Sequence, residues 1–128
     1  MAVSILVDTD VCIDYLRGRP QTVHWLEEVA GPLLVSAVTV AELFARVRDG
    51  AERGQLEEFL RAFAVVPVDE HIAKQGGLFR RDYRKSHGTG LADALIAAAA
   101  EISGATLATL NDTHFPMLGR VLVPYRKN

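Results

Sequence analysis

The chain has 128 residues, enough for one domain, and 49% of them are hydrophobic, so it can bury a core without disulfide or metal support. Its 14 Lys and Arg are balanced by 16 Asp and Glu, and the net charge of −2 excludes a uniformly basic nucleic-acid-binding surface while leaving room for a local basic patch. The single cysteine, Cys12, excludes an internal disulfide and a cysteine-pair metal site, and it fits a reducing compartment.

Apolar runs of strand length alternate with stretches of helical periodicity along the chain. In the first half of the chain we expect a strand at residues 5–7, helices at 11–17 and 21–30, a strand at 33–35, a helix capped by Ser36 that runs to about Asp49, and a helix at 52–63. In the second half we expect a strand at 64–68, a helix capped by Asp69 that Gly76-Gly77 weakens in its middle, a loop at 86–90, a helix at 91–103, and strands at 106–110 and 121–123. This alternation predicts an α/β fold, a three-layer sandwich with a mainly parallel central sheet, in a single domain over residues 1–128.

Oxygen ligands follow two of the predicted strands. Asp8 comes directly after the first strand, and Asn111 and Asp112 follow the strand at 106–110. Ligands bind beyond the carboxyl ends of parallel strands, so these side chains share one edge of the sheet if the two strands are neighbours. The alternative for Asp8 is a structural one, in which it only caps the next helix.

Two further acids stand on apolar helices. Glu42 lies in the apolar stretch 35–44 with Thr39 on the same helical face, and a carboxylate so placed is costly to bury unless it is paired or binds a metal. Its alternative is a solvated helix face with Arg46 as an i+4 partner. Asp93 lies in the first turn of an alanine-rich helix, where the helix dipole alone would also favour an acid.

Taken together, these positions place hard oxygen ligands on four elements, a donor set suited to Mg²⁺ or Mn²⁺. Such an ion activates water and neutralises charge on a phosphoryl group. Other chemistries have weaker support, because the four histidines (His24, His71, His87 and His114) lack metal-ligand spacing and are expected at the surface or as caps. No nucleophile elbow and no glycine-rich phosphate loop is found.

One segment is densely basic, the run RRDYRKSH at residues 80–87. It is either a solvated helix end or a patch that contacts phosphate or a partner. Arg17 and Arg19 are candidates for the same role near Asp8.

Four segments carry a resemblance to a known family: LVDTD at residues 6–10, SAVTVAEL at 36–43, DALIAA at 93–98 and LATLNDTHF at 107–115. Over nearly the whole chain the sequence resembles the PIN-domain ribonucleases, and most closely the VapC toxins of bacterial toxin–antitoxin pairs. The resemblance implies that Asp8, Glu42 and Asp93 are the acidic site residues, with Asp8 and Asp93 as metal ligands. It implies supporting roles for Thr9, Thr39 and Thr109, and it places the fourth acidic position on Asn111, an amide here, with Asp112 next to it.

The resemblance also implies an activity and partners. We expect an endoribonuclease that depends on Mg²⁺ or Mn²⁺, cuts RNA such as tRNA, forms a homodimer and is held inactive by a cognate antitoxin. Apolar residues near Trp25 and at 59–63 are the expected groove for an antitoxin helix. With neither a signal peptide nor a membrane-spanning stretch in the sequence, we expect a cytoplasmic protein.

Two other functions compete with this one. A phospho-accepting domain of the response-regulator or phosphatase type would also carry an Asp after its first strand, but it would want a Lys at a late strand end, where this chain has Asn111-Asp112. The second is a catalytically idle PIN-like module that only binds RNA or a partner.

Overall fold

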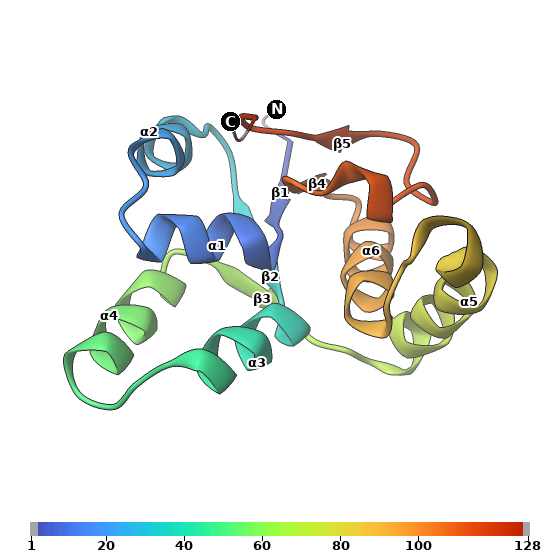
Figure 1. Cartoon of the computed structure of the whole chain (residues 1–128), viewed down its shortest axis with the longest axis horizontal. Helices are drawn as coiled ribbons and strands as arrows, with labels where there is room; N and C mark the ends of the chain where they lie inside the picture. The colour runs from blue at the N-terminus through green and yellow to red at the C-terminus, as the bar shows by residue number, and fades with distance from the viewer. Residues whose placement is uncertain (1–2, 127–128) are drawn as a thin grey trace.

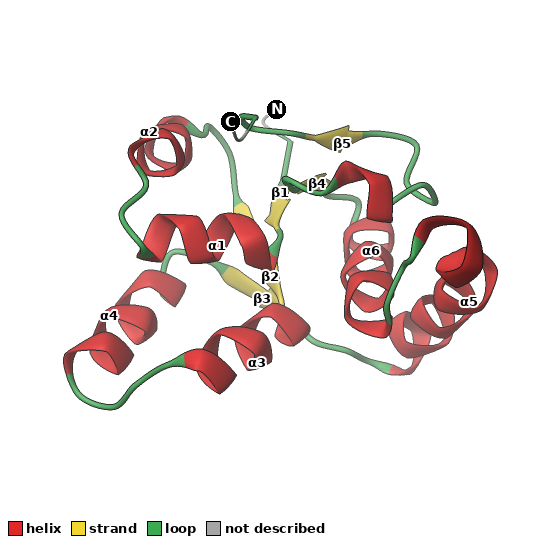
Figure 2. Cartoon of the chain, viewed as in Figure 1, coloured by secondary structure: helices red, strands yellow, loops and turns green. Residues whose placement is uncertain are grey.

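The computed structural model describes residues 3–126, and its centre is a five-stranded sheet in which every neighbouring pair is parallel (Figure 2). The strand order is β3-β2-β1-β4-β5. The strands are β1 (Ile5–Val7), β2 (Leu33–Ser36), β3 (Ala64–Val66), β4 (Thr106–Ala108) and β5 (Val121–Leu122). β1 therefore lies in the middle, with Ile5 paired to Leu33 on one side and to Thr106 on the other.

Helices cover both faces of the sheet, as Figure 1 shows with α1, α2 and α4 on one side and α5 and α6 on the other. The helices are α1 (Thr9–Leu16), α2 (Pro20–Glu28), α3 (Ala37–Arg46), α4 (Ala51–Leu60), α5 (Glu70–His87), α6 (Leu91–Ser103) and the short 3₁₀ helix η1 (Asp112–His114). This arrangement confirms the three-layer α/β sandwich expected from the sequence.

The two faces of the central strand explain the two halves of the core. Leu6 packs with α5 and α6, whereas Ile5 and Val7 pack with α1 to α4, because successive side chains of a strand point to opposite faces. Both faces of β1 are buried, so its sequence is a continuous apolar run rather than an alternating one.

Several predicted boundaries differ from the structure for local reasons. α3 ends at Arg46, three residues before the expected end, because Val47 is extended with ψ of 144°. β3 stops before Pro67, which has no N–H to donate to a neighbouring strand. α5 continues to His87 and ends in the left-handed conformation at Gly88, so the expected loop at 86–90 is shorter.

The Gly76-Gly77 pair, which is expected to weaken the middle of this helix, does not interrupt it, since α5 is unbroken from Glu70 to His87. Tertiary packing accounts for the first of the two glycines: a Cβ on Gly76 would lie 2.6 Å from Leu95 Cδ2 and 3.1 Å from Leu95 Cα. The missing side chain lets α5 and α6 approach closely, and packing then outweighs the low helix propensity of glycine.

Candidate active site

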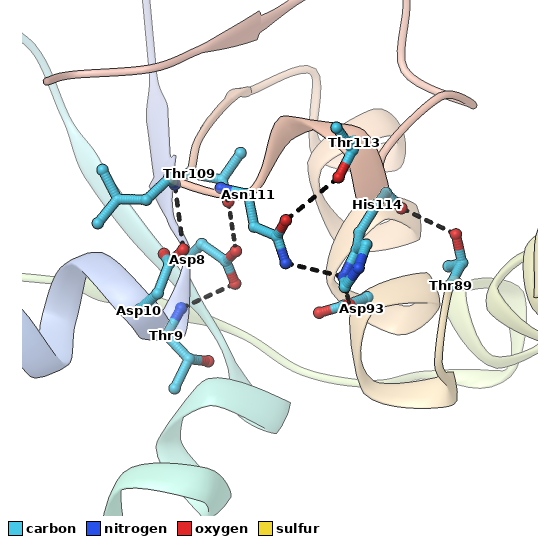
Figure 3. A network of polar contacts seen from close by, with 10 residues as sticks. Asp8, Thr9, Asp10, Thr89, Asp93, Thr109, Asn111, Thr113 and His114 are labelled. Atoms are coloured by element: carbon cyan, nitrogen blue, oxygen red, sulfur yellow. Dashed lines mark hydrogen bonds and ion pairs between the residues drawn. The ribbon is translucent and has the colours of Figure 1, made fainter. Parts of the chain in front are cut away.

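Asp8 lies at the carboxyl end of β1 and is 5% exposed. Its Oδ1 accepts a 2.8 Å hydrogen bond from the Thr9 amide, so Asp8 is the N-cap of α1, as one of the two sequence interpretations held. Its Oδ2 accepts a 2.7 Å hydrogen bond from Thr109 Oγ1, at the end of neighbouring β4 (Figure 3). The cap and the site role therefore coexist, because β1 and β4 are neighbours and their carboxyl ends meet.

The environment of Asp8 opposes its negative charge. Burial raises the pKa of this carboxyl from 3.8 to about 7, and the nearby charges of Asp10 and Asp93 add to the rise, while the hydrogen bonds from Thr109 and Thr9 act against it. Three carboxylates thus repel one another at this sheet edge. A bound cation would relieve that repulsion.

Asp10 belongs to this cluster, and the sequence analysis did not single it out. Its Oδ1 accepts from the Val11 amide at 2.7 Å, and its Oδ2 accepts from the Leu110 amide at 3.1 Å. It thereby ties the start of α1 to the segment after β4. The signal available in the sequence was its position two residues after Asp8, in the first helical turn, where backbone N–H groups have no partner within the helix.

Glu42 is joined to the site through two threonines. Thr9 Oγ1 donates to Glu42 Oε1 at 2.7 Å and lies 2.9 Å from the hydroxyl of Thr39, which is fully buried. The expected supporting roles of Thr9 and Thr39 are consistent with this geometry. The alternative ion pair between Glu42 and Arg46 does not form among residues 3–126.

Asp93, in the first turn of α6, faces η1 across the site. Its Oδ2 lies 3.1 Å from His114 Nδ1, and the same nitrogen lies 2.8 Å from Asn111 Nδ2. Asn111 sits between the Asp93 side and the Asp8 side of the network in Figure 3, and its backbone N–H donates to Thr109 Oγ1 at 3.1 Å. Asn111 thus connects the two halves of the site.

Asp112 is oriented differently from Asn111. Its Oδ1 forms an ion pair of 3.7 Å with Arg126 Nη1, on the segment after β5. Of the two candidates for the fourth position, the geometry therefore favours Asn111.

His114 was expected from the sequence to be a surface or capping residue, yet its ring contacts a site carboxylate and its side chain is 34% exposed. Its backbone carbonyl accepts from the buried Thr89 hydroxyl at 2.9 Å, which fixes η1 against the loop before α6. No spacing rule in the sequence pointed to this role, because the contact joins residues 21 positions apart.

Two further candidates are placed away from the carboxylates. Arg19 pairs at 3.5 Å with Asp14, which is buried on α1, and Arg17 caps the far end of that helix, eight residues from its start. Arg19 therefore has a structural partner rather than a free guanidinium for phosphate. Cys12 is fully buried, and burial raises the pKa of its thiol, so it is not a nucleophile.

The donor chemistry fits a hard divalent cation, since the site offers carboxylate oxygens and an amide. Within residues 3–126, however, no three acidic, histidine or cysteine side chains converge closely enough to form a ready-made metal cage. An ion at Asp8 and Asp93 would thus rely on solvent or substrate for part of its coordination, as Mg²⁺ commonly does.

Comparison with known proteins gives the class. The PIN-domain family model matches residues 5–121, and this chain belongs to that family. It is 44% identical over 124 residues to "Ribonuclease VapC10" of Mycobacterium tuberculosis, covering 94% of this chain and 92% of the relative. It is also 40% identical to "Ribonuclease VapC19" of the same organism, over 94% of this chain and 98% of the relative.

Solved structures agree on the fold. The chain superposes on FitAcB from Neisseria gonorrhoeae with a TM-score of 0.74 and 34% identity, covering 94% of this chain and 97% of the other. A toxin–antitoxin complex from Klebsiella pneumoniae gives a TM-score of 0.83 at 24% identity, over 96% and 99% of the two chains, which supports the fold alone.

Proposed function

We propose that this protein is a metal-dependent endoribonuclease that acts as the toxin of a toxin–antitoxin pair. The observation that carries the proposal is the cluster of carboxylates at one sheet edge, where burial and the charges of Asp10 and Asp93 raise the pKa of Asp8. Membership of the PIN family and similarity to proteins named ribonucleases support it.

The proposed reaction is hydrolysis of an RNA phosphodiester by in-line attack of water. A bound Mg²⁺ or Mn²⁺ would supply an activated water and neutralise charge on the phosphoryl group. Asp8 and Asp93 would hold the ion between them, since their side chains lie on opposite sides of the site (Figure 3). Glu42, fixed by the Thr9 hydroxyl, can orient water or accept its proton. The side-chain amide of Asn111 can donate an Nδ2–H to a phosphate oxygen.

The test is induced expression of the wild type, followed by mapping of new RNA 5′ ends, with Asp8→Asn and Asp93→Asn as inactive variants. Glu101→Gln is the matched control, because it removes a carboxylate from the exposed part of the same helix α6. New 5′ ends that appear with the wild type and the control but with neither site variant are expected. Full cleavage by Asp93→Asn at saturating Mg²⁺ would show that the site is wrongly assigned.

The same mapping, together with a Mn²⁺ titration of the purified wild type and Asp8→Asn, separates the idle PIN-like module from the nuclease. An idle module would bind RNA or a partner, produce no new 5′ ends and show no Mn²⁺ binding that depends on Asp8. Asn111→Ala and Asp112→Ala decide the fourth position, and only the first should abolish cleavage.

An antitoxin is the proposed partner, and its binding surface is an apolar groove of about 560 Å³. The groove lies over α1, α2 and α4, with Tyr15 stacked on Phe59 at a centroid distance of 4.9 Å and Phe59 against Phe63 at 4.9 Å. An amphipathic helix fits such a groove. Trp25, which was expected here, packs instead against the core and does not line the groove.

Other expectations stay predictions: tRNA as substrate, a homodimer and a cytoplasmic location. Over residues 3–126, none of the helices has both the length and the apolar character needed to cross a bilayer. Sedimentation of the purified protein tests the dimer.

A further inference from the structure

A pocket of about 430 Å³ lies along α5 beside the first residue of α6, and none of the site carboxylates lines it. Four of its six lining residues are cationic, and the lining consists of Gly77, Arg80, Arg81, Arg84, Lys85 and Leu91. Residues spaced by three or four along a helix share one face, so the spacing of the helical members explains why they meet. The concentration of positive charge is notable in a chain whose net charge is −2.

Most of these cations have no anionic partner in the protein. Among residues 3–126, Arg80, Arg84 and Lys85 form no ion pair, and only Arg81 does, with Asp82 at 2.8 Å. The arginines of α4 and its end differ, since both of them, Arg53 and Arg61, contact neighbouring acids. Among the described residues, three unpaired cations therefore meet in this one pocket, whereas the arginines of α4 and its end are paired.

The buried part of Arg80 argues against a merely solvated helix end. Its Nε is buried and has no hydrogen-bond partner among the described residues. Cations in the last turn favour the helix dipole, which accounts for Arg84 and Lys85. Arg80 lies about two turns before His87, beyond the range of that effect, and an unpartnered buried donor is costly unless a ligand supplies the acceptor.

Gly77 leaves the pocket open. Its neighbour Gly76 is needed for packing against Leu95, but a Cβ on Gly77 would meet nothing within 4 Å. Glycine costs a helix up to about 1 kcal/mol relative to alanine. At Gly77 no contact within the protein offsets this cost, whereas a side chain there would project beside the cations.

We propose that this pocket binds backbone phosphates of the RNA substrate, next to the site of cleavage. The inference rests on the proposed ribonuclease function and adds a subsite to it. Guanidinium groups bind phosphate oxygens through paired N–H donors, and Arg80, Arg81 and Arg84 bring three guanidinium groups to the pocket lining. Leu91, in the pocket lining, and Asp93, at the site, both lie in the first turn of α6, so an RNA strand that passes around this end of the helix can reach the pocket and the carboxylates.

The experiment compares Arg80→Gln/Arg84→Gln with Arg53→Gln/Arg61→Gln, a control that removes the same charge from α4 and its C-cap. Binding of a mixed-sequence single-stranded RNA is measured in EDTA as a function of KCl, because phosphate contacts are independent of sequence. Cleavage kinetics are measured on the RNA mapped in vivo. Loss of two phosphate contacts should flatten the slope of log K against log [KCl] by about 1.4, at about 0.7 per contact. KM should rise while kcat is unchanged, and the control should match the wild type.

A second variant guards against loss of fold. Gly77→Glu places a carboxylate at the open face of the pocket and raises helix propensity, so it should keep thermal stability while weakening RNA binding. An unchanged salt slope in both pocket variants would overturn the proposal. It would do so even if these variants weakened binding of an acidic protein or shifted the oligomeric state, because the pocket would then serve another partner. If the wild type binds RNA and cleaves none, the nuclease function fails, and the binding slopes still decide the pocket.

Discussion

The raised pKa of Asp8 predicts that this carboxylate lowers the stability of the protein at neutral pH. The native pKa is about 7 against 3.8 for the unperturbed group, so the native state binds this proton more tightly than the unfolded state does. Stability therefore falls as pH rises between the two values and is constant above the upper one. The difference of about three pKa units corresponds to a loss of about 4 kcal/mol in the free energy of unfolding. Roughly 2–3 kcal/mol of this loss occurs between pH 5 and pH 8.

Asp8→Asn removes the charge and keeps the oxygen that caps α1. We expect the variant to be inactive and more stable than the wild type in EDTA, with a gap in unfolding free energy that widens by roughly 2–3 kcal/mol from pH 5 to pH 8. The assay is urea unfolding followed by circular dichroism. Asp69→Asn is the control, since the Asp69 carboxylate also caps a helix, α5, by accepting from the Ile72 amide, but at an exposed site.

A gap that is equal at pH 5 and pH 8 would refute the reasoning, because the cost of the buried charge must depend on its ionisation. Adding Mn²⁺ at pH 8 gives a further check. It should raise the Tm of the wild type and leave that of Asp8→Asn unchanged, since a ligand stabilises only the state that binds it. Equal shifts in both proteins would remove Asp8 from the metal site.

Three other substitutions test contacts that hold the fold together. Gly76→Ala should destabilise the protein by about 1–3 kcal/mol, because the new Cβ would press on Leu95. Gly77→Ala should stabilise it by up to about 1 kcal/mol, because alanine has the higher helix propensity and its Cβ would meet nothing within 4 Å. Thermal unfolding checks both, and equal effects would contradict the different roles of the two glycines. Tyr125→Phe removes the 3.0 Å hydrogen bond to buried Asp14 and should lower the free energy of unfolding by about 1–3 kcal/mol, with kcat unchanged. A drop in kcat with normal stability would show instead that this contact serves the site.

The local part of this structure could be predicted because its signals lie within a few residues of one another. The helix caps are examples: Ser36 Oγ accepts from the Val38 amide at 3.0 Å, and Asp69 Oδ1 accepts from Ile72 at 2.8 Å, as the sequence indicated for both. The continuous apolar run before Asp8 likewise identified a strand buried on both faces. Periodicity and capping chemistry act over one or two turns, so they are visible in the sequence itself.

The assembly of the site was decided by tertiary structure. Thr109 reaches Asp8 across 101 positions because β4 pairs with β1, and the sequence predicted both strands without giving their order. The same sheet order brings Asp10 against the segment after β4 and turns His114 toward Asp93. The sequence by itself determined which oxygen ligands end up near strand and helix ends. Their distances, and the raised pKa of Asp8, depend on which strands are neighbours, because burial and charge repulsion arise only between groups that the fold has brought together.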